Sequence, residues 1–310
     1  MANNTNGTSV IAKIPSGVWI SLTALSIFLS IFATLGNVLI LVALRNVSSI
    51  RPPTKLLFRC LAIPDLCVGL LCHPLYVYGM YIRISLNIGN FIVELAYVFA
   101  FIISVLVAVS ILTSAAISVD RLLALLLGLR YRHVVTLCRV RVVIACFWLI
   151  AVSNSSLLWV NLILFSDKVG LAILWTFVVL TLISMIISTF SYTKIFFTLR
   201  HQQAQVQNHL QSKQSSRITS VLIIARYKTT VYSAAWIQFA MLACYGPYII
   251  LTILHNSGKN SYFTTEIEIA LEFSYCLAFF NSSLNPVLYC WRIKDVRQQV
   301  KKTIRKCLCC

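Results

Sequence analysis

Seven long apolar stretches constrain this chain more than any other feature. The second contains only Asp65 among Asp, Glu, Lys and Arg, and the other six contain none of these; the stretches are residues 14–44, 60–82, 95–119, 142–166, 169–193, 229–258 and 273–291. Each is long enough for the roughly 20 apolar residues that a bilayer-spanning helix needs. With 11% charged residues, against about 25% in a soluble domain, the chain lacks a polar surface. The sequence therefore predicts an all-α membrane protein with seven transmembrane helices.

We expect a single domain over residues 1–310, because short loops join the stretches and no internal repeat is visible. The expected helices are 17–44, 56–82, 92–124, 141–165, 169–198, 226–255 and 267–290. After the last of them, Ile293, Val296, Val300 and Ile304 recur at helical spacing among Lys and Arg. That stripe predicts a short amphipathic helix over residues 292–306, lying in the membrane interface.

Basic residues indicate which ends of the helices face the cytoplasm. With the N-terminus outside, all but four of the 26 Lys and Arg residues fall in the inner loops and tail; the four are Lys13, Arg83, Lys168 and Lys259. By the positive-inside rule, we expect a multi-pass plasma-membrane protein with an extracellular N-terminus and a cytoplasmic C-terminus. Orientation and contact with anionic membrane lipid explain the net charge of +18, so no nucleic acid is expected as a partner.

Two kinds of covalent modification are expected near the chain ends. Asn3 and Asn6 begin Asn-x-Thr sequons on the outer side, which favours glycosylation. Cys307, Cys309 and Cys310 follow the amphipathic helix, and juxtamembrane cysteines of this kind favour S-palmitoylation. The alternative for the cysteines is that they are free thiols in a reducing cytosol.

Polar residues inside the apolar stretches indicate function, because polar groups are expensive at membrane depth. The seventh stretch contains Asn-Pro-Val-Leu-Tyr at 285–289, where the proline breaks the helical hydrogen-bond ladder beside two polar side chains. Asp65 stands alone in the second stretch, and Asp-Arg-Leu at 120–122 closes the third. We interpret this pattern as a helix that changes shape in a protein that signals or transports.

With Asn37 after Gly36, Trp148 and Pro247, these features place a marker in almost every predicted helix, in a fixed order. At this point the chain resembles the rhodopsin-like (class A) G-protein-coupled receptors, over essentially all 310 residues. The resemblance implies a receptor that binds an extracellular ligand and activates a heterotrimeric G protein, with arrestin as a further partner. No enzyme is expected, since no His-Glu-x-x-His, Gly-x-Ser-x-Gly or phosphate-loop motif is present.

The resemblance also implies roles for matched positions. Arg121 would pair with Asp120 in the inactive receptor and swing toward the G protein in the active one. Tyr192 and Tyr289 would help to hold the active arrangement, and Leu129 would insert into the G protein. The full set expected to serve coupling and activation is Asp120, Arg121, Leu122, Leu129, Tyr192, Pro247, Asn285, Pro286 and Tyr289.

A sodium ion is the only metal or cofactor that the resemblance implies. The positions that match the family's internal sodium pocket are Asp65, Ser110, Asn281, Ser282 and Asn285. Hard cations prefer such oxygen ligands, and the bound ion would act allosterically by favouring the inactive state. The alternative is a protonated Asp65 hydrogen-bonded to Asn285 and Asn37.

Several positions depart from the family pattern. Pro247 should kink the sixth helix and act as its pivot, but the tryptophan usually found two residues earlier is Tyr245, and the aromatic six residues earlier is Met241. Ala96 replaces the cysteine that usually bonds the second outer loop, and Ser184 replaces a proline of the fifth helix. In lacking this cysteine and this proline, the chain resembles the group that contains melanocortin, lysophospholipid, cannabinoid and adenosine receptors.

The ligand is constrained mainly by exclusion. Phe279 replaces the lysine that carries retinal in opsins, and Ile103 replaces the aspartate of monoamine receptors. A pocket is expected in the outer half, lined by Ile103, Ser104, Val107, Tyr245, Tyr248 and Phe279. Two other functions stay open from the residues alone: a transporter or channel, which can also use a buried Asp and a kinked helix, and a non-signalling receptor-like scaffold.

Overall fold

A computed structural model describes residues 15–85, 89–164, 168–209, 236, 239–254 and 264–308. Within these ranges every regular element is a helix. The elements are α2 (Ser16–Asn46), α3 (Pro52–Cys67), the π-helix η1 (Val68–Cys72), α4 (His73–Ser85), α5 (Gly89–Leu127), the 3₁₀-helix η2 (Gly128–Arg130), α6 (Tyr131–Val134), α7 (Leu137–Leu164), α8 (Lys168–His209), the helical segment Phe239–Leu254, α10 (Thr264–Arg292) and α11 (Lys294–Leu308). Residues 226–235, 237, 238 and 255 of the expected sixth helix lie outside the described part.

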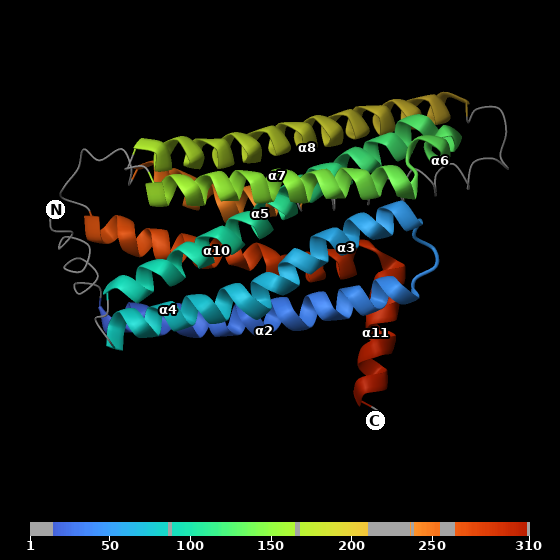
Figure 1. The fold of residues 1–310 in the computed structure, drawn as a ribbon. Helices are drawn as coiled ribbons and strands as arrows, with labels where there is room; N and C mark the ends of the chain where they lie inside the picture. Colours follow the sequence, from blue (N-terminus) through green and yellow to red (C-terminus); the bar gives the residue numbers. More distant parts are fainter. Residues whose placement is uncertain are drawn as a thin grey trace.

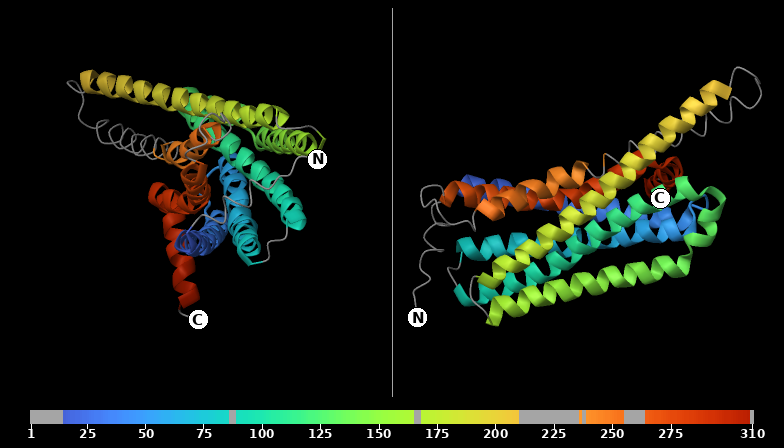
Figure 2. Two further views of the ribbon diagram at one scale, coloured as in Figure 1. Left: turned by 90° about the vertical axis from the view of Figure 1, so that its left-hand side faces the viewer. Right: turned by 90° about the horizontal axis from the view of Figure 1, so that it is seen from above.

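The long helices lie side by side as a bundle, and α11 turns away from it after α10 (Figure 1). The short connection between α2 and α3, the helix α6 and the start of α11 gather at the same end of the bundle. We call this the basic end, because Arg51, Arg130 and Arg132 lie in these connections. Helix α8 extends past the bundle at this end (Figure 2).

The bundle exposes large apolar side chains on its outside and buries polar ones within, as expected of helices that face lipid. Among the described residues, five helices are long and apolar enough to cross a membrane: Gly17–Asn46, Pro52–Ile82, Phe101–Val134, Leu137–Leu157 and Val178–Gln202. Ile20, Leu149 and Phe190 are each more than 60% exposed, whereas Asn37 and Asp65 are almost completely buried. Polar groups in a membrane protein face the bundle interior, where neighbouring helices can satisfy them.

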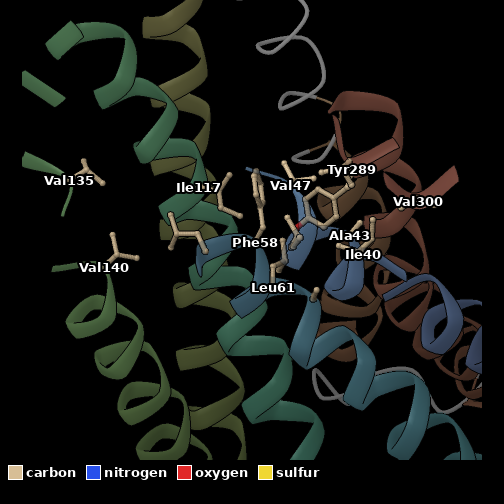
Figure 3. Close-up of a cluster of buried hydrophobic side chains, with 14 of the residues drawn as sticks. Ile40, Ala43, Val47, Phe58, Leu61, Ile117, Val135, Val140, Tyr289 and Val300 are labelled. Carbon is tan, nitrogen blue, oxygen red and sulfur yellow. The ribbon is translucent and has the colours of Figure 1, made fainter. Parts of the chain in front are cut away.

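A cluster of buried apolar side chains joins α2, α3, α5, α10 and α11 near the basic end (Figure 3). Phe58 meets Tyr289 edge to face with their ring centroids 5.1 Å apart. Val296 and Val300 of α11 are buried in the same cluster, and Ile293 packs against it. The predicted amphipathic stripe therefore turns partly toward the bundle. Ser49, before α3, donates a hydrogen bond to the Asp295 carboxylate at the start of α11.

Two glycines allow close approach of the first helix to its neighbours. A Cβ added at Gly36 of α2 would lie 2.8 Å from Cγ of Pro286, so α2 and α10 touch at the Asn-Pro motif inside α10. A Cβ added at Gly69 of η1 would lie 2.6 Å from Thr34 Oγ1 and 2.9 Å from the Thr34 backbone nitrogen. Small residues at such crossings are how membrane helices achieve tight packing.

The π-helix η1 lies just before Pro74, which has no backbone N–H to donate. In the wider turn the His73 N–H bonds to the Val68 carbonyl, five residues earlier, as π geometry requires. The next bond of that kind would join residue 74 to the Gly69 carbonyl, and a proline cannot make it. Ser30 of α2 supplies the missing donor, with Oγ 2.7 Å from the Gly69 oxygen. The bulge is therefore bonded across helices.

Candidate functional site

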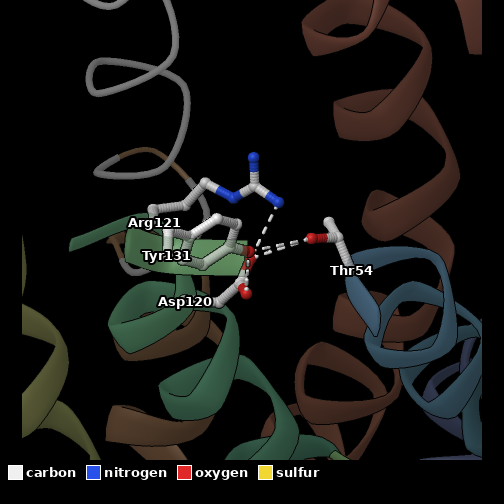
Figure 4. A network of polar contacts seen from close by, with 4 residues as sticks. All are labelled: Thr54, Asp120, Arg121 and Tyr131. Atoms are coloured by element: carbon white, nitrogen blue, oxygen red, sulfur yellow. Dashed lines mark hydrogen bonds and ion pairs between the residues drawn. The ribbon is translucent and has the colours of Figure 1, made fainter. Parts of the chain in front are cut away.

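The Asp120 carboxylate at the basic end of α5 is the centre of a buried polar network (Figure 4). Arg121 Nη2 lies 2.9 Å from Asp120 Oδ2 as an ion pair. Thr54 Oγ1 donates to the same oxygen at 3.1 Å, and Tyr131 OH donates to Asp120 Oδ1 at 2.6 Å. Asp120 is 3% exposed and Arg121 26%. Hydrogen bonds to an ionised partner are roughly twice as strong as neutral ones, so this arrangement fixes the end of α5.

Thr54 and Tyr131 were not expected from the sequence. Thr54 lies in the first turn of α3, where Pro52 is well suited to begin a helix, and Tyr131 begins α6. The Arg51 guanidinium carbon lies 4.5 Å from the centre of the Tyr131 ring, close enough for a cation–π contact. The available signals, a threonine after two prolines and a tyrosine between two arginines, do not show that either side chain reaches Asp120.

Other residues expected at this end make separate contacts. Leu122 packs with Tyr192 in a small apolar cluster between α5 and α8. Ser118 Oγ donates to Tyr192 OH at 2.8 Å, while Tyr289 packs against Phe58. Leu129 in η2 is 92% exposed, so a partner protein could reach it without any rearrangement.

The expected sodium ligands are all buried. Asn285 Nδ2 donates to Asp65 Oδ2 at 2.6 Å, and the exposed fractions of Ser110, Asn281 and Ser282 are 3% or less. No group of three or more His, Cys, Asp or Glu side chains that could hold a metal occurs among the described residues. The donors here are instead one carboxylate with hydroxyl and amide groups, a set that fits a hard monovalent cation.

Asn37 is part of this buried region, but its side-chain amide donates to backbone carbonyls and not to Asp65. Its Nδ2 donates to the carbonyls of Ala33 at 2.9 Å and Ser282 at 3.1 Å. Its Oδ1 is buried without a hydrogen-bond partner among the described groups. A buried acceptor of this kind is costly, and a bound cation or water is the sort of group that would satisfy it.

Tyr245 connects the sixth helix to this region. It is 4% exposed and packs with Ile111, Met241 and Ala278. Asn281 Nδ2 donates to its hydroxyl at 3.3 Å. The tyrosine that replaces the usual tryptophan thus contacts an expected sodium ligand, and Pro247 lies two residues farther along the same helical segment.

The six expected pocket residues fall into separate groups of contacts. Phe279 and Ile103 belong to an apolar cluster with Tyr76, and Val107 packs beside Tyr245. Ser104 Oγ turns to α7 and donates to Ser155 Oγ at 2.7 Å. The rings of Tyr248 and Tyr275 lie with centroids 4.9 Å apart.

The expected modification positions lie at or beyond the ends of the described residues. Asn3, Asn6, Cys309 and Cys310 are outside the described residues, and Cys307 lies in the last turn of α11. Glycosylation and palmitoylation therefore stay predictions.

Comparison with known proteins agrees with this geometry. The model of the family described as 7 transmembrane receptor (rhodopsin family) matches residues 36–289. Melanocortin receptor 5 of Mus musculus is 24% identical over 92% of this chain and 85% of its own length. Adenosine receptor A3 of Ovis aries is 25% identical over 94% and 92%, and growth hormone secretagogue receptor type 1 of Sus scrofa is 24% identical over 94% and 82%.

Among solved structures, the crystal structure of squid rhodopsin is similar with a TM-score of 0.77 and 18% identity, covering 96% of this chain and 88% of that one. This likeness confirms the fold of seven transmembrane helices. Melanocortin and adenosine receptors, two of the groups indicated by the missing cysteine and proline, are among the relatives. The family match favours a receptor over a transporter or channel.

Proposed function

Since the chain belongs to the rhodopsin family of seven-transmembrane receptors, we propose that it binds an extracellular ligand and activates a heterotrimeric G protein through a cytoplasmic cleft around Arg121. The observation that carries this proposal is the Asp120 network, which holds Arg121 beside its carboxylate at the basic end. A state in which Arg121 leaves Asp120 would free the guanidinium for a partner. Ligand binding would shift the equilibrium toward that state by its difference in affinity for the two states.

The basic end would face the cytoplasm of the plasma membrane, with the N-terminus outside. Support comes from the arginines gathered in the connections at this end, which the positive-inside rule places in the cytoplasm. The exposed Leu129 lies in the same connection as the Asp120 partner Tyr131. A G protein or arrestin that contacts Leu129 would therefore act next to the network.

Replacing Arg121 with alanine is expected to abolish G-protein activation, because the proposed cleft would lose its central cation. The measurement is basal activation across a panel of Gα biosensors, normalised to receptor at the cell surface. Arg45→Ala is the matched control, since Arg45 is an exposed arginine in the last turn of α2. Wild-type activity that survives Arg121→Ala would contradict the proposal, and wild-type activity at background for every Gα would support a non-signalling scaffold.

A sodium ion bound at Asp65, with Ser110, Asn281, Ser282 and Asn285 around it, would favour the inactive state. The buried carboxylate and the unpartnered Asn37 oxygen support this proposal. In the receptor, the ion would hold the polar groups of several helices around one charge.

Sodium is expected to raise the thermal unfolding midpoint of the purified receptor, compared with potassium or N-methyl-D-glucamine at equal ionic strength. A ligand at tenfold its Kd stabilises the folded state by about 1.4 kcal/mol, which corresponds to a few degrees. Asp65→Asn should remove the sodium effect, since the amide carries no charge. A wild-type unfolding midpoint that does not change with sodium, or an unchanged sodium effect in Asp65→Asn, would count against sodium binding at Asp65.

A further inference from the structure

The outer parts of α4 and α10 share a cluster of polar and aromatic side chains that the sodium and coupling proposals leave unused. We define the outer cluster as His73, Tyr76, Glu272 and Phe279. Tyr76 OH donates to Glu272 Oε2 at 2.8 Å. The Phe279 ring centroid lies 5.1 Å from that of His73 and 6.1 Å from that of Tyr76, and both contacts are edge to face.

Helical spacing explains why these four side chains meet. His73 and Tyr76 are three residues apart on α4, and Glu272 and Phe279 are seven apart on α10, so each pair lies on one face of its helix. The π-helix η1 ends immediately before His73 and inserts one extra residue into the turn. The bulge therefore changes the direction in which His73 points, and π-bulges of this kind are frequent at functional sites.

His73 independently indicates that a ligand binds here. Its side chain is completely buried, and neither ring nitrogen has a hydrogen-bond partner among the described groups. A neutral imidazole carries one donor and one acceptor, and leaving both unpaired in a buried place is costly. Unpaired buried groups call for an explanation, and a bound molecule that supplies the partner is one.

Glu272 supplies the charge of the outer cluster. Its side chain is half-buried, and a carboxylate has about four acceptor positions, so it can hold Tyr76 and also accept from a ligand. Glu268 lies four residues earlier on the same side of α10, and like charges at this spacing repel. Two carboxylates on the same side of α10 favour a cation at this place, as do the nearby aromatic rings.

We infer that the outer cluster binds the cationic group of the extracellular ligand, an alkylammonium or guanidinium, at Glu272. A polar group at the ligand's other end reaches His73 past the Phe279 ring. This inference rests on the proposed receptor function and names the chemical class of its ligand. The position differs from that of Ile103, where the monoamine-receptor aspartate is missing.

Matched pairs of small probes test the assignment on purified receptor in lipid nanodiscs, with no G protein present. The pairs are 2-phenylethylamine with 2-phenylethanol, and tyramine with tyrosol; each amine is charged at pH 7.4 and each alcohol is neutral. Binding is measured from the rise in thermal unfolding midpoint with probe concentration. Wild type is expected to bind each amine at least tenfold more tightly than its alcohol.

Glu272→Gln should reduce that preference to less than about threefold, because the amide keeps the shape and loses the charge. Glu266→Gln, at an exposed glutamate on the same helix, should leave it unchanged. His73→Phe should weaken tyramine, whose phenol can bond to the imidazole, and spare 2-phenylethylamine. Should Glu272→Gln fail to fold, the ratio of amine affinity to alcohol affinity still tests the assignment. It is then measured in wild type and in Tyr76→Phe, which keeps the Glu272 carboxylate.

The assignment is overturned if neither amine binds wild type, if the alcohols bind equally well, or if Glu272→Gln and Glu266→Gln lose the preference equally. The last result would mean a general attraction to an acidic surface. Failure here is distinct from failure of the proposed function, because basal G-protein activation of wild type and Arg121→Ala reports coupling without these probes.

Discussion

Gly69→Ala is expected to destabilise the folded receptor by roughly 2–3 kcal/mol, the usual cost of forcing an extra methyl into a packed interior. The added Cβ would lie 2.6 Å from Thr34 Oγ1, 2.9 Å from the Thr34 backbone nitrogen and 3.1 Å from Ala33 Cβ. Thr34 is β-branched and has few rotamers with which to yield, and a backbone atom cannot yield without moving α2. The methyl would also disturb the Ser30 hydrogen bond to the Gly69 carbonyl.

The measurement is the thermal unfolding midpoint of purified receptor, for which 2–3 kcal/mol corresponds to a fall of about 3–5 °C. Gly79→Ala is the matched control, because Gly79 is also in the second transmembrane helix and an added Cβ meets nothing within 4 Å. That variant should be neutral or stabilised by about 0.5–1 kcal/mol, the usual helix preference for alanine over glycine. Equal midpoints for Gly69→Ala and Gly79→Ala would show that α2 and η1 can separate at little cost.

The fold was predictable because its signals are local. A charge-free stretch of about 20 residues is enough to indicate a membrane-spanning helix, and the stripe of Val296 and Val300 indicates α11 by spacing alone. What spacing does not give is the partner of each face. The burial of Val296 and Val300 against the bundle depends on where α10 ends and how Ser49 meets Asp295.

The candidate site was predictable where a residue matched a family motif, as with Asp120, Arg121 and Asp65. It was not predictable where contacts join distant segments. Thr54 is 66 residues from Asp120 and Tyr76 is 196 residues from Glu272, and nothing in either local sequence encodes the meeting. Such contacts follow from helix packing, including the bulge at η1.

Asp120→Asn is expected to raise basal G-protein activation about tenfold. The carboxylate accepts from three side chains, Arg121, Thr54 and Tyr131, and the ion pair is largely buried. An asparagine keeps one acceptor oxygen but loses the charge and the second acceptor, so Arg121 is held less tightly in the inactive state. A loss of about 1.4 kcal/mol in the inactive state alone shifts a two-state equilibrium tenfold.

Three further variants of the receptor test whether the rise in basal activation acts through Arg121. Asp295→Asn removes an exposed carboxylate at the same end that also accepts a side-chain hydroxyl, and it should leave basal activation at the wild-type level. Tyr131→Phe removes one donor to Asp120 and should give a smaller rise than Asp120→Asn. The double variant Asp120→Asn with Arg121→Ala should fall to background, because the gain acts through the released arginine. A rise in Asp295→Asn equal to that in Asp120→Asn, or one that persists in the double variant, would show that the Asp120 network does not restrain Arg121.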